Sequence, residues 1–138
     1  MTNQELIDDL NGAIELEVQA FLQYHYQSLL LKGLNTGTLK AMLEKESSKE
    51  AEHAKTLAAR VVALGGRPTT KIGSFEIGAS TDEMLRLNIA REERAVALYR
   101  KIVSSLRHKE GFELVYYEVL TILGHELEDL EEFQALLG

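Results

Sequence analysis

Four long amphipathic segments each carry a glutamate where the apolar stripe of a helix calls for a hydrophobic side chain. These glutamates are Glu17, Glu50, Glu92 and Glu126. A buried, unpaired carboxylate costs several kcal/mol, and four that converge repel one another strongly. A fold that brings them together therefore needs a cation among them, and a pair of divalent metal ions is the simplest candidate.

The four segments are predicted to be helices. Apolar residues recur with the 3.6-residue period of an α-helix, and the 138 residues include one proline. Thr2 with Glu5 and Ser80 with Glu83 have the spacing of capping boxes, and Gly33 is a natural stop for the first helix. The predicted helices span residues 4–32, 36–64, 80–108 and 112–137.

The connections between these segments predict the topology. The first and third connections are short, so the helices that they join are expected to pair antiparallel. Residues 65–79 form a longer connection, rich in Gly, Thr and Ser, that can cross the length of a bundle whose helices are about 40 Å long. We therefore expect one all-α domain over residues 1–138, a four-helix bundle of two antiparallel pairs joined by one long crossover.

Composition and charge exclude several classes of function. The chain has no cysteine, so disulfides and thiolate metal sites are excluded, and its net charge of −7 argues against a nucleic-acid surface. No apolar stretch approaches the ~20 residues that span a bilayer, and the first residues do not resemble a secretory signal. We expect a cytoplasmic protein without nucleic-acid or membrane partners.

The first two helices each present a carboxylate on an apolar face. Ile14 and Tyr24 lie three residues before and seven residues after Glu17, on one helical face. On the second helix, His53 follows Glu50 by one turn, so both side chains can reach one ion. The Glu-x-x-His spacing often occurs by chance, and a lone histidine is more often a hydrogen-bonded structural residue than a metal ligand.

The third helix places Glu92 at the centre of its apolar face, between Ile89 and Val96. Several charged residues lie off the apolar faces of the second and third helices. We expect these side chains in outer or solvated positions: Glu46, Glu52, Arg91 and Arg94.

The fourth helix has two alternative registers. Apolar residues at Val119, Ile122, Leu123, Leu130 and Phe133 centre its stripe on Glu126 and place Asp129 one turn later. His125 lies about 100° away, at the edge of the stripe. We interpret Glu126 and Asp129 as the ligand pair and His125 as a neighbouring or surface group. The alternative is that His125 is the ligand, in an Ile122-x-x-His125 pair.

These residues resemble the ferritin-like di-iron carboxylate proteins, most closely the bacterioferritins, over nearly the whole chain. The resemblance rests on the segments Glu17-Val-Gln-Ala-Phe-Leu-Gln-Tyr24 and Glu50-Ala-Glu-His53, on Glu92, and on Leu120-Thr-Ile-Leu123 just before the last ligand pair. It implies that Glu50 and Glu126 bridge two metal ions. Glu17 and His53 would complete one position, and Glu92 and Asp129 the other.

The chain departs from the bacterioferritin pattern at three places. Asp129 stands where the family has a second histidine, which makes one metal position rich in oxygen and weaker. Ala51 occupies the position of the haem-ligating methionine, so no haem is expected. The sequence ends at Gly138 without the family's short fifth helix, so cage assembly and mineral storage do not follow from the resemblance.

The resemblance implies two iron ions, with manganese or another divalent metal as alternatives, and oxidation of Fe(II) by dioxygen or peroxide in iron handling or oxidative-stress protection. Tyr24 is the candidate catalytic residue: it and Tyr99 could donate hydrogen bonds or electrons, or could simply be core residues. Two other functions stay open, a non-catalytic four-helix interaction module and a di-iron oxidase of an organic substrate.

A second apolar face predicts self-association. Leucines outside the central stripe occur on the first and third helices, at Leu16, Leu22, Leu29 and Leu98. Closed two-fold dimers are the commonest homo-oligomers, so we expect a homodimer.

Overall fold

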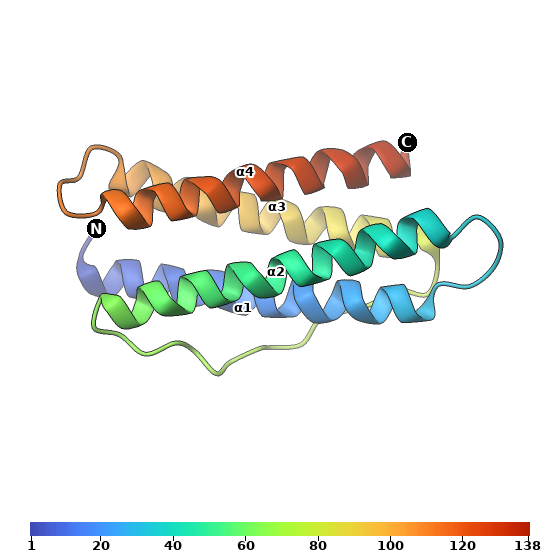
Figure 1. The fold of residues 1–138 in the computed structure, drawn as a ribbon, viewed down its shortest axis with the longest axis horizontal. Helices are drawn as coiled ribbons and strands as arrows, with labels where there is room; N and C mark the ends of the chain where they lie inside the picture. Colours follow the sequence, from blue (N-terminus) through green and yellow to red (C-terminus); the bar gives the residue numbers. More distant parts are fainter.

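The computed structural model describes residues 1–138 and contains four α-helices and no strand (Figure 1). The helices are α1 (Asn3–Leu30), α2 (Gly37–Ala63), α3 (Thr81–Leu106) and α4 (Glu113–Leu137). The predicted all-α class is confirmed. None of the four helices offers a stretch both long and apolar enough to cross a membrane.

The helix starts follow from local capping. The Thr2 side chain accepts a hydrogen bond from the Glu5 backbone, and the Glu5 carboxylate accepts one from the Thr2 backbone, so the predicted capping box is complete. At α3, Ser80 caps the Glu83 backbone in the same way, but the Glu83 carboxylate accepts from the amide of Ala79 instead of Ser80. These bonds satisfy backbone N–H groups that the first turn of a helix leaves without a partner.

The bundle consists of two antiparallel pairs, α1 with α2 and α3 with α4, as predicted (Figure 1). The crossover from α2 to α3 runs along the outside of the bundle beside α1. The Gln27 side chain donates to the carbonyl of Ile77 at 2.9 Å, and Gln19 donates to the carbonyl of Ile72. The two glutamines thus attach the crossover to α1.

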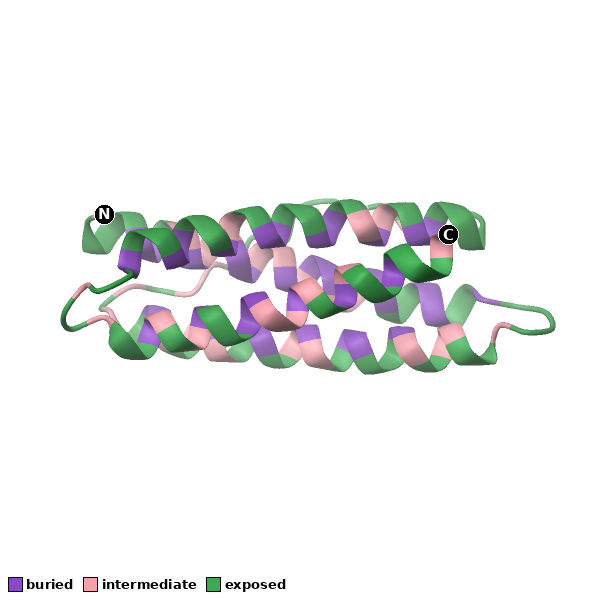
Figure 2. Cartoon of the chain, turned by 90° about the horizontal axis from the view of Figure 1, so that it is seen from above, coloured by how far each residue is buried: buried purple, intermediate pink, exposed green.

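The core is divided into two apolar clusters. The larger cluster contains Leu10, Tyr99 and Ile122, and the smaller one contains Tyr24 and Phe133. On every helix the buried acidic residues come between the residues that join the two clusters, and Figure 2 shows the buried positions along the inward side of the bundle. Apolar packing on both sides therefore fixes the position of a polar layer in the middle.

Candidate metal centre

The polar layer brings the six predicted ligand residues together. Each has at most 5% of its surface exposed: Glu17, Glu50, His53, Glu92, Glu126 and Asp129. Their possible ligand atoms form two groups of four, and within each group the atoms lie within 4.8 Å of one another. One group contains Glu17 and His53, the other contains Glu92 and Asp129, and both contain Glu50 and Glu126. Two adjoining cations that share two carboxylates could fit this arrangement.

His53 uses its two ring nitrogens differently. Nδ1 points into the cluster, 3.0 Å from Glu126 Oε1 and 3.2 Å from Glu17 Oε2. Nε2 lies 2.9 Å from Nδ1 of His125, and the two rings stack with their centroids 5.2 Å apart. The half-buried His125 therefore contacts the cluster through His53, and a hydrogen bond at Nε2 leaves the Nδ1 lone pair free to bind a cation.

Two buried tyrosines donate hydrogen bonds to the cluster. The Tyr24 hydroxyl donates to Glu92 and its ring packs against Phe133, while the Tyr99 hydroxyl donates to Glu17 Oε1 at 2.6 Å. Burial and the nearby carboxylates raise the pKa of both phenols, so they remain protonated donors. Tyr24 thus orients Glu92, and Tyr99 orients Glu17. Each of these carboxylates belongs to only one of the two ligand groups.

Glu46 was expected in solvent, and this was wrong. It is 2% exposed, and the ammonium of Lys49 lies 2.9 Å from its Oε2 and 3.0 Å from Oδ1 of Asp129. The signal was present, because Glu46 precedes Glu50 by four residues and so shares its face. Glu46, Asp129 and the exposed Glu132 form a third acidic group.

Arg91 was expected at the surface, and this was also wrong. Its side chain is 4% exposed and donates to Gln19 Oε1 at 2.7 Å and to Gln23 Oε1 at 3.2 Å. Asn88 extends the network, because it accepts from Gln23 and donates to Gln27, both at 2.8 Å. Arg94 and Glu52 are exposed, as expected.

Four of the buried carboxylic acids ionise less readily than usual in the absence of a cation. Burial and the negative neighbours raise the pKa of Glu50, Glu92 and Glu126 well above the usual range, and burial with the adjacent Glu46 raises the pKa of Asp129 to about 9. Burial acts in the same direction on Glu17, but its hydrogen bonds, that with His53 foremost, outweigh burial and lower its pKa.

The donor set fits divalent cations. Some buried carboxylate oxygens of the cluster accept no hydrogen bond, and they belong to Glu50, Glu92, Glu126 and Asp129. Such oxygens are costly to bury without a partner. Carboxylates with one imidazole suit iron, manganese and zinc, whereas a purely monovalent ion would leave most of the charge uncompensated.

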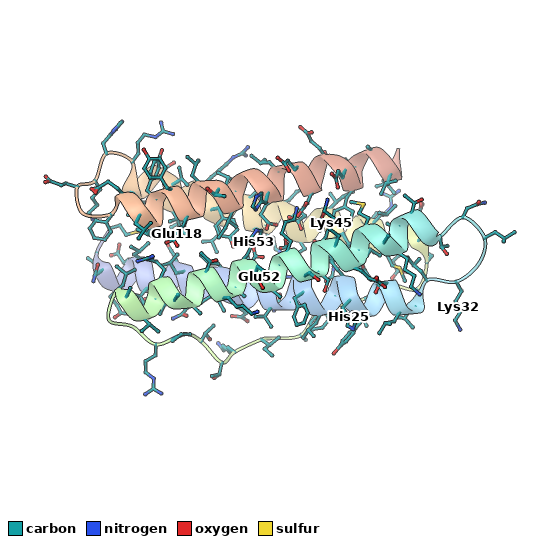
Figure 3. The ribbon with its side chains drawn as sticks, viewed as in Figure 1. His25, Lys32, Lys45, Glu52, His53 and Glu118 are labelled. Atoms are coloured by element: carbon teal, nitrogen blue, oxygen red, sulfur yellow. The ribbon has the colours of Figure 1, made fainter.

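A cavity of about 410 Å³ leads to the cluster from between α2 and α4. Its lining residues are Lys49, Glu52, His53, Thr56, Tyr117, Glu118, Thr121, Ile122 and His125. Figure 3 shows His53 in the space between α2 and α4, with Glu52 and Glu118 on those helices. The imidazole pair therefore separates the carboxylates from this cavity.

Comparisons with known proteins identify the family of this chain. Residues 7–138 match the family model of the ferritin-like domain. A bacterioferritin from Rhodobacter capsulatus is 31% identical over 70% of this chain and 61% of its own length, and one from Desulfovibrio desulfuricans is 29% identical over 72% and 56%. The chain thus spans less than two thirds of these relatives. A ferritin-like, diiron-carboxylate protein from Bacillus anthracis superposes over the whole of both chains with a TM-score of 0.93 and 28% identity.

Proposed function

Because this chain belongs to the ferritin-like domain family, we propose that it binds two iron ions and oxidises Fe(II) with dioxygen or peroxide. The observation that carries the proposal is the pair of overlapping ligand groups, which share Glu50 and Glu126. Two shared carboxylates would hold two cations in adjoining positions, as in other two-metal sites. The activity would serve iron handling or protection against oxidative stress.

Two metal positions match the number of electrons that the proposed reaction transfers. Each Fe(II) gives up one electron, and dioxygen takes two electrons and two protons to become hydrogen peroxide. In this proposal Glu17 and His53 complete one position, and Glu92 and Asp129 complete the other. Carboxylates bind both Fe(II) and Fe(III), so the same side chains can hold substrate and product.

The surrounding residues of the chain have defined roles in this proposal. Tyr24 and Tyr99 fix the orientation of Glu92 and Glu17 by hydrogen bonds, and Tyr24 is the candidate for a direct part in the reaction. His125 holds the ring of His53 so that Nδ1 faces the cluster. The cavity between α2 and α4 ends at His53, and in this proposal Fe(II) and the oxidant approach the cluster past the imidazole pair.

We also propose that the protein forms a homodimer. Leu29 is 58% exposed on α1, whereas Leu16, Leu22 and Leu98 are half-buried. Exposed and half-buried leucines outside the core offer apolar surface that a second copy can cover. Sedimentation at micromolar concentration is expected to give about twice the 15.5 kDa of one chain, and a 15.5 kDa species would contradict the proposal.

Metal stoichiometry and Fe(II) oxidation test the proposed function together. The purified protein, loaded with Fe(II) without oxygen, is expected to bind two ions per chain and to oxidise them rapidly when oxygen is admitted. E50Q removes a shared carboxylate and is expected to lose at least one ion. E52Q is the matched control, because Glu52 is exposed on the same helix and lies outside both groups.

Two results would favour the other functions. Native protein that binds no divalent metal would contradict the proposal and favour a non-catalytic interaction module. Native protein that binds two ions, but consumes oxygen only when an organic compound is added, would favour an oxidase of an organic substrate. A metal analysis that finds manganese in place of iron would overturn the choice of metal but not the two positions.

A further inference from the structure

Lys49 is the one lysine or arginine that forms an ion pair with a residue of the candidate metal centre. Its ammonium lies between Glu46 Oε2, at 2.9 Å, and Asp129 Oδ1, at 3.0 Å. Both carboxylates are at least 98% buried, and the lysine side chain itself is 24% exposed. A full positive charge is therefore fixed at one side of the carboxylate cluster.

Asp129 is shared between this ammonium and the cluster. Its Oδ1 accepts the hydrogen bond from Lys49, its Oδ2 is buried and accepts no hydrogen bond, and the residue belongs to the group with Glu50, Glu92 and Glu126. A carboxylate that is hydrogen-bonded to one cation is a weaker ligand for another, and the two cations also repel each other. The group that contains Glu17 and His53 has no such ammonium.

We propose that Lys49 is a built-in cation of the cluster that makes the two metal positions unequal, tight at Glu17 and His53 and weak at Glu92 and Asp129. The inference rests on the proposed two-metal function and specifies how that site is regulated. The weak position exchanges its ion readily, which suits a position where the substrate Fe(II) enters and Fe(III) leaves.

The ammonium of Lys49 also supplies positive charge to the third acidic group. Glu46, Asp129 and Glu132 could hold a cation, and Lys49 already supplies a charge to two of them. Because the lysine is covalently attached to α2, its effective concentration there is high, and a free metal ion must compete with it. Lys49 thus keeps a third metal ion out while leaving Asp129 Oδ2 available.

The test measures binding of Co(II), which is not oxidised by air under these conditions, by calorimetry and by its visible absorption. Native protein is expected to bind two ions with different affinities. K49M keeps the length of the side chain and removes the charge, so the weaker ion should bind about tenfold more tightly or better while the tighter ion changes little.

Two further variants make this result specific. E46Q/K49M removes one positive and one negative charge, so the net charge beside the cluster is unchanged and Glu46 cannot create a third site. The tightening of the second ion should persist in this double variant. K45M removes one positive charge from an exposed position of α2 that has no ion pair, so both affinities should stay within about twofold of the native values.

The outcomes separate this inference from the proposed function. If native protein binds no pair of ions, the two-metal function fails and this inference fails with it. If two ions bind but the second affinity in E46Q/K49M is unchanged or weaker, the role of Lys49 is overturned while the two-metal site stands. Tightening in K49M alone would also overturn it, because the gain would then come from the freed Glu46.

Discussion

The α1–α3 side and the α2–α4 side of the bundle surround the carboxylate cluster with different kinds of contact. Where α1 meets α3, the guanidinium of Arg91 donates hydrogen bonds to the amides of Gln19 and Gln23, and Gln23 in turn donates to Asn88. Where α2 meets α4, the packing is looser, and a cavity of about 410 Å³ reaches His53 and its stacked neighbour. A cavity of about 420 Å³ also lies on the α1–α3 side, but it ends at this hydrogen-bonded network, whereas the cavity on the α2–α4 side reaches His53, a residue of the cluster.

The interior cations on the two sides differ in the same sense. Arg91 has neutral amide partners and no ion pair, and burial together with the neighbouring Arg94 lowers its pKa. Lys49 is bound by two carboxylates, Glu46 and Asp129, which raise its pKa against the effect of burial. A cation held by neutral groups is structural, whereas a cation held by a ligand carboxylate competes with metal for that ligand.

The largest effect on metal binding is expected at α4, where Glu126 belongs to the cluster and His125 lines the cavity between α2 and α4. E126A should abolish binding of at least one metal ion, because Glu126 is fully buried and belongs to both ligand groups. H125A should leave two ions bound, because His125 reaches the cluster only through His53. Elemental analysis after dialysis against Zn(II) measures the stoichiometry of both variants.

Stability without metal supplies a second measurement on E126A. Its carboxylate has a raised pKa because of burial and the negative charge of Glu17, so its loss relieves repulsion in the metal-free protein. The metal-free variant should therefore be no less stable than the native protein. Loss of metal in H125A but not in E126A would show that the register of α4 is wrong and that His125 is the ligand.

The hydrogen-bond network around Arg91, between α1 and α3, is expected to affect stability instead of metal binding. R91A leaves the side-chain oxygens of Gln19 and Gln23 without their donor in a buried site, which costs about 2 kcal/mol of unfolding free energy. R94A, at an exposed position three residues later, should change it by about 0.5 kcal/mol or less. Urea unfolding of the metal-free variants measures both, and two Zn(II) ions should still bind to each. Binding of fewer than two Zn(II) ions by R91A would mean that the network around Arg91 also positions metal ligands.

Most of the fold could be predicted because its determinants are local. Every helix end lies within two residues of the predicted one, since caps such as Thr2 and Ser80 act on their own first turn. The position of Glu126 and Asp129 inside α4 also followed from periodicity along a single helix, and both are buried in the structure. Their role as metal ligands stays a prediction.

The two wrong positions depend on contacts between helices. Lys49 and Asp129 are 80 residues apart, and Arg91 and Gln19 are 72 residues apart, so no pattern within one helix shows either contact. Long side chains can also lie along a helix and reach a neighbour that their own position does not face. The face of Glu46 and the i,i+3 spacing of Glu46 and Lys49 were visible in the sequence, but the contact of Lys49 with Asp129 of α4 was not.

The pH dependence of the metal-free protein should distinguish the two sides further. The pKa of Asp129 is about 9 in the folded protein, above the ordinary aspartate value of 3.8 that applies to the unfolded chain, so its contribution to stability is present at low pH and is lost as pH rises through this interval. Thermal midpoints without metal should thus fall between about pH 5 and pH 8. The trend should flatten in D129N but not in E131Q, which changes an exposed residue of α4. Saturating Zn(II) should oppose the fall, because metal binds the deprotonated ligands.

The smallest expected effect concerns the rate of entry. Thr121 lines the cavity between α2 and α4, and T121F adds a ring that narrows the route to His53 without touching a ligand. Ser74 lines a cavity of similar size on the other side, beside Arg91, so S74F is the matched control. Stopped-flow binding of Co(II) should be several-fold slower in T121F and unchanged in S74F, with equal affinities at equilibrium in both. Because affinity is fixed by the ligands while the rate depends on the path, slowing in S74F alone would place the entrance on the α1–α3 side and reverse the assignment of the two sides.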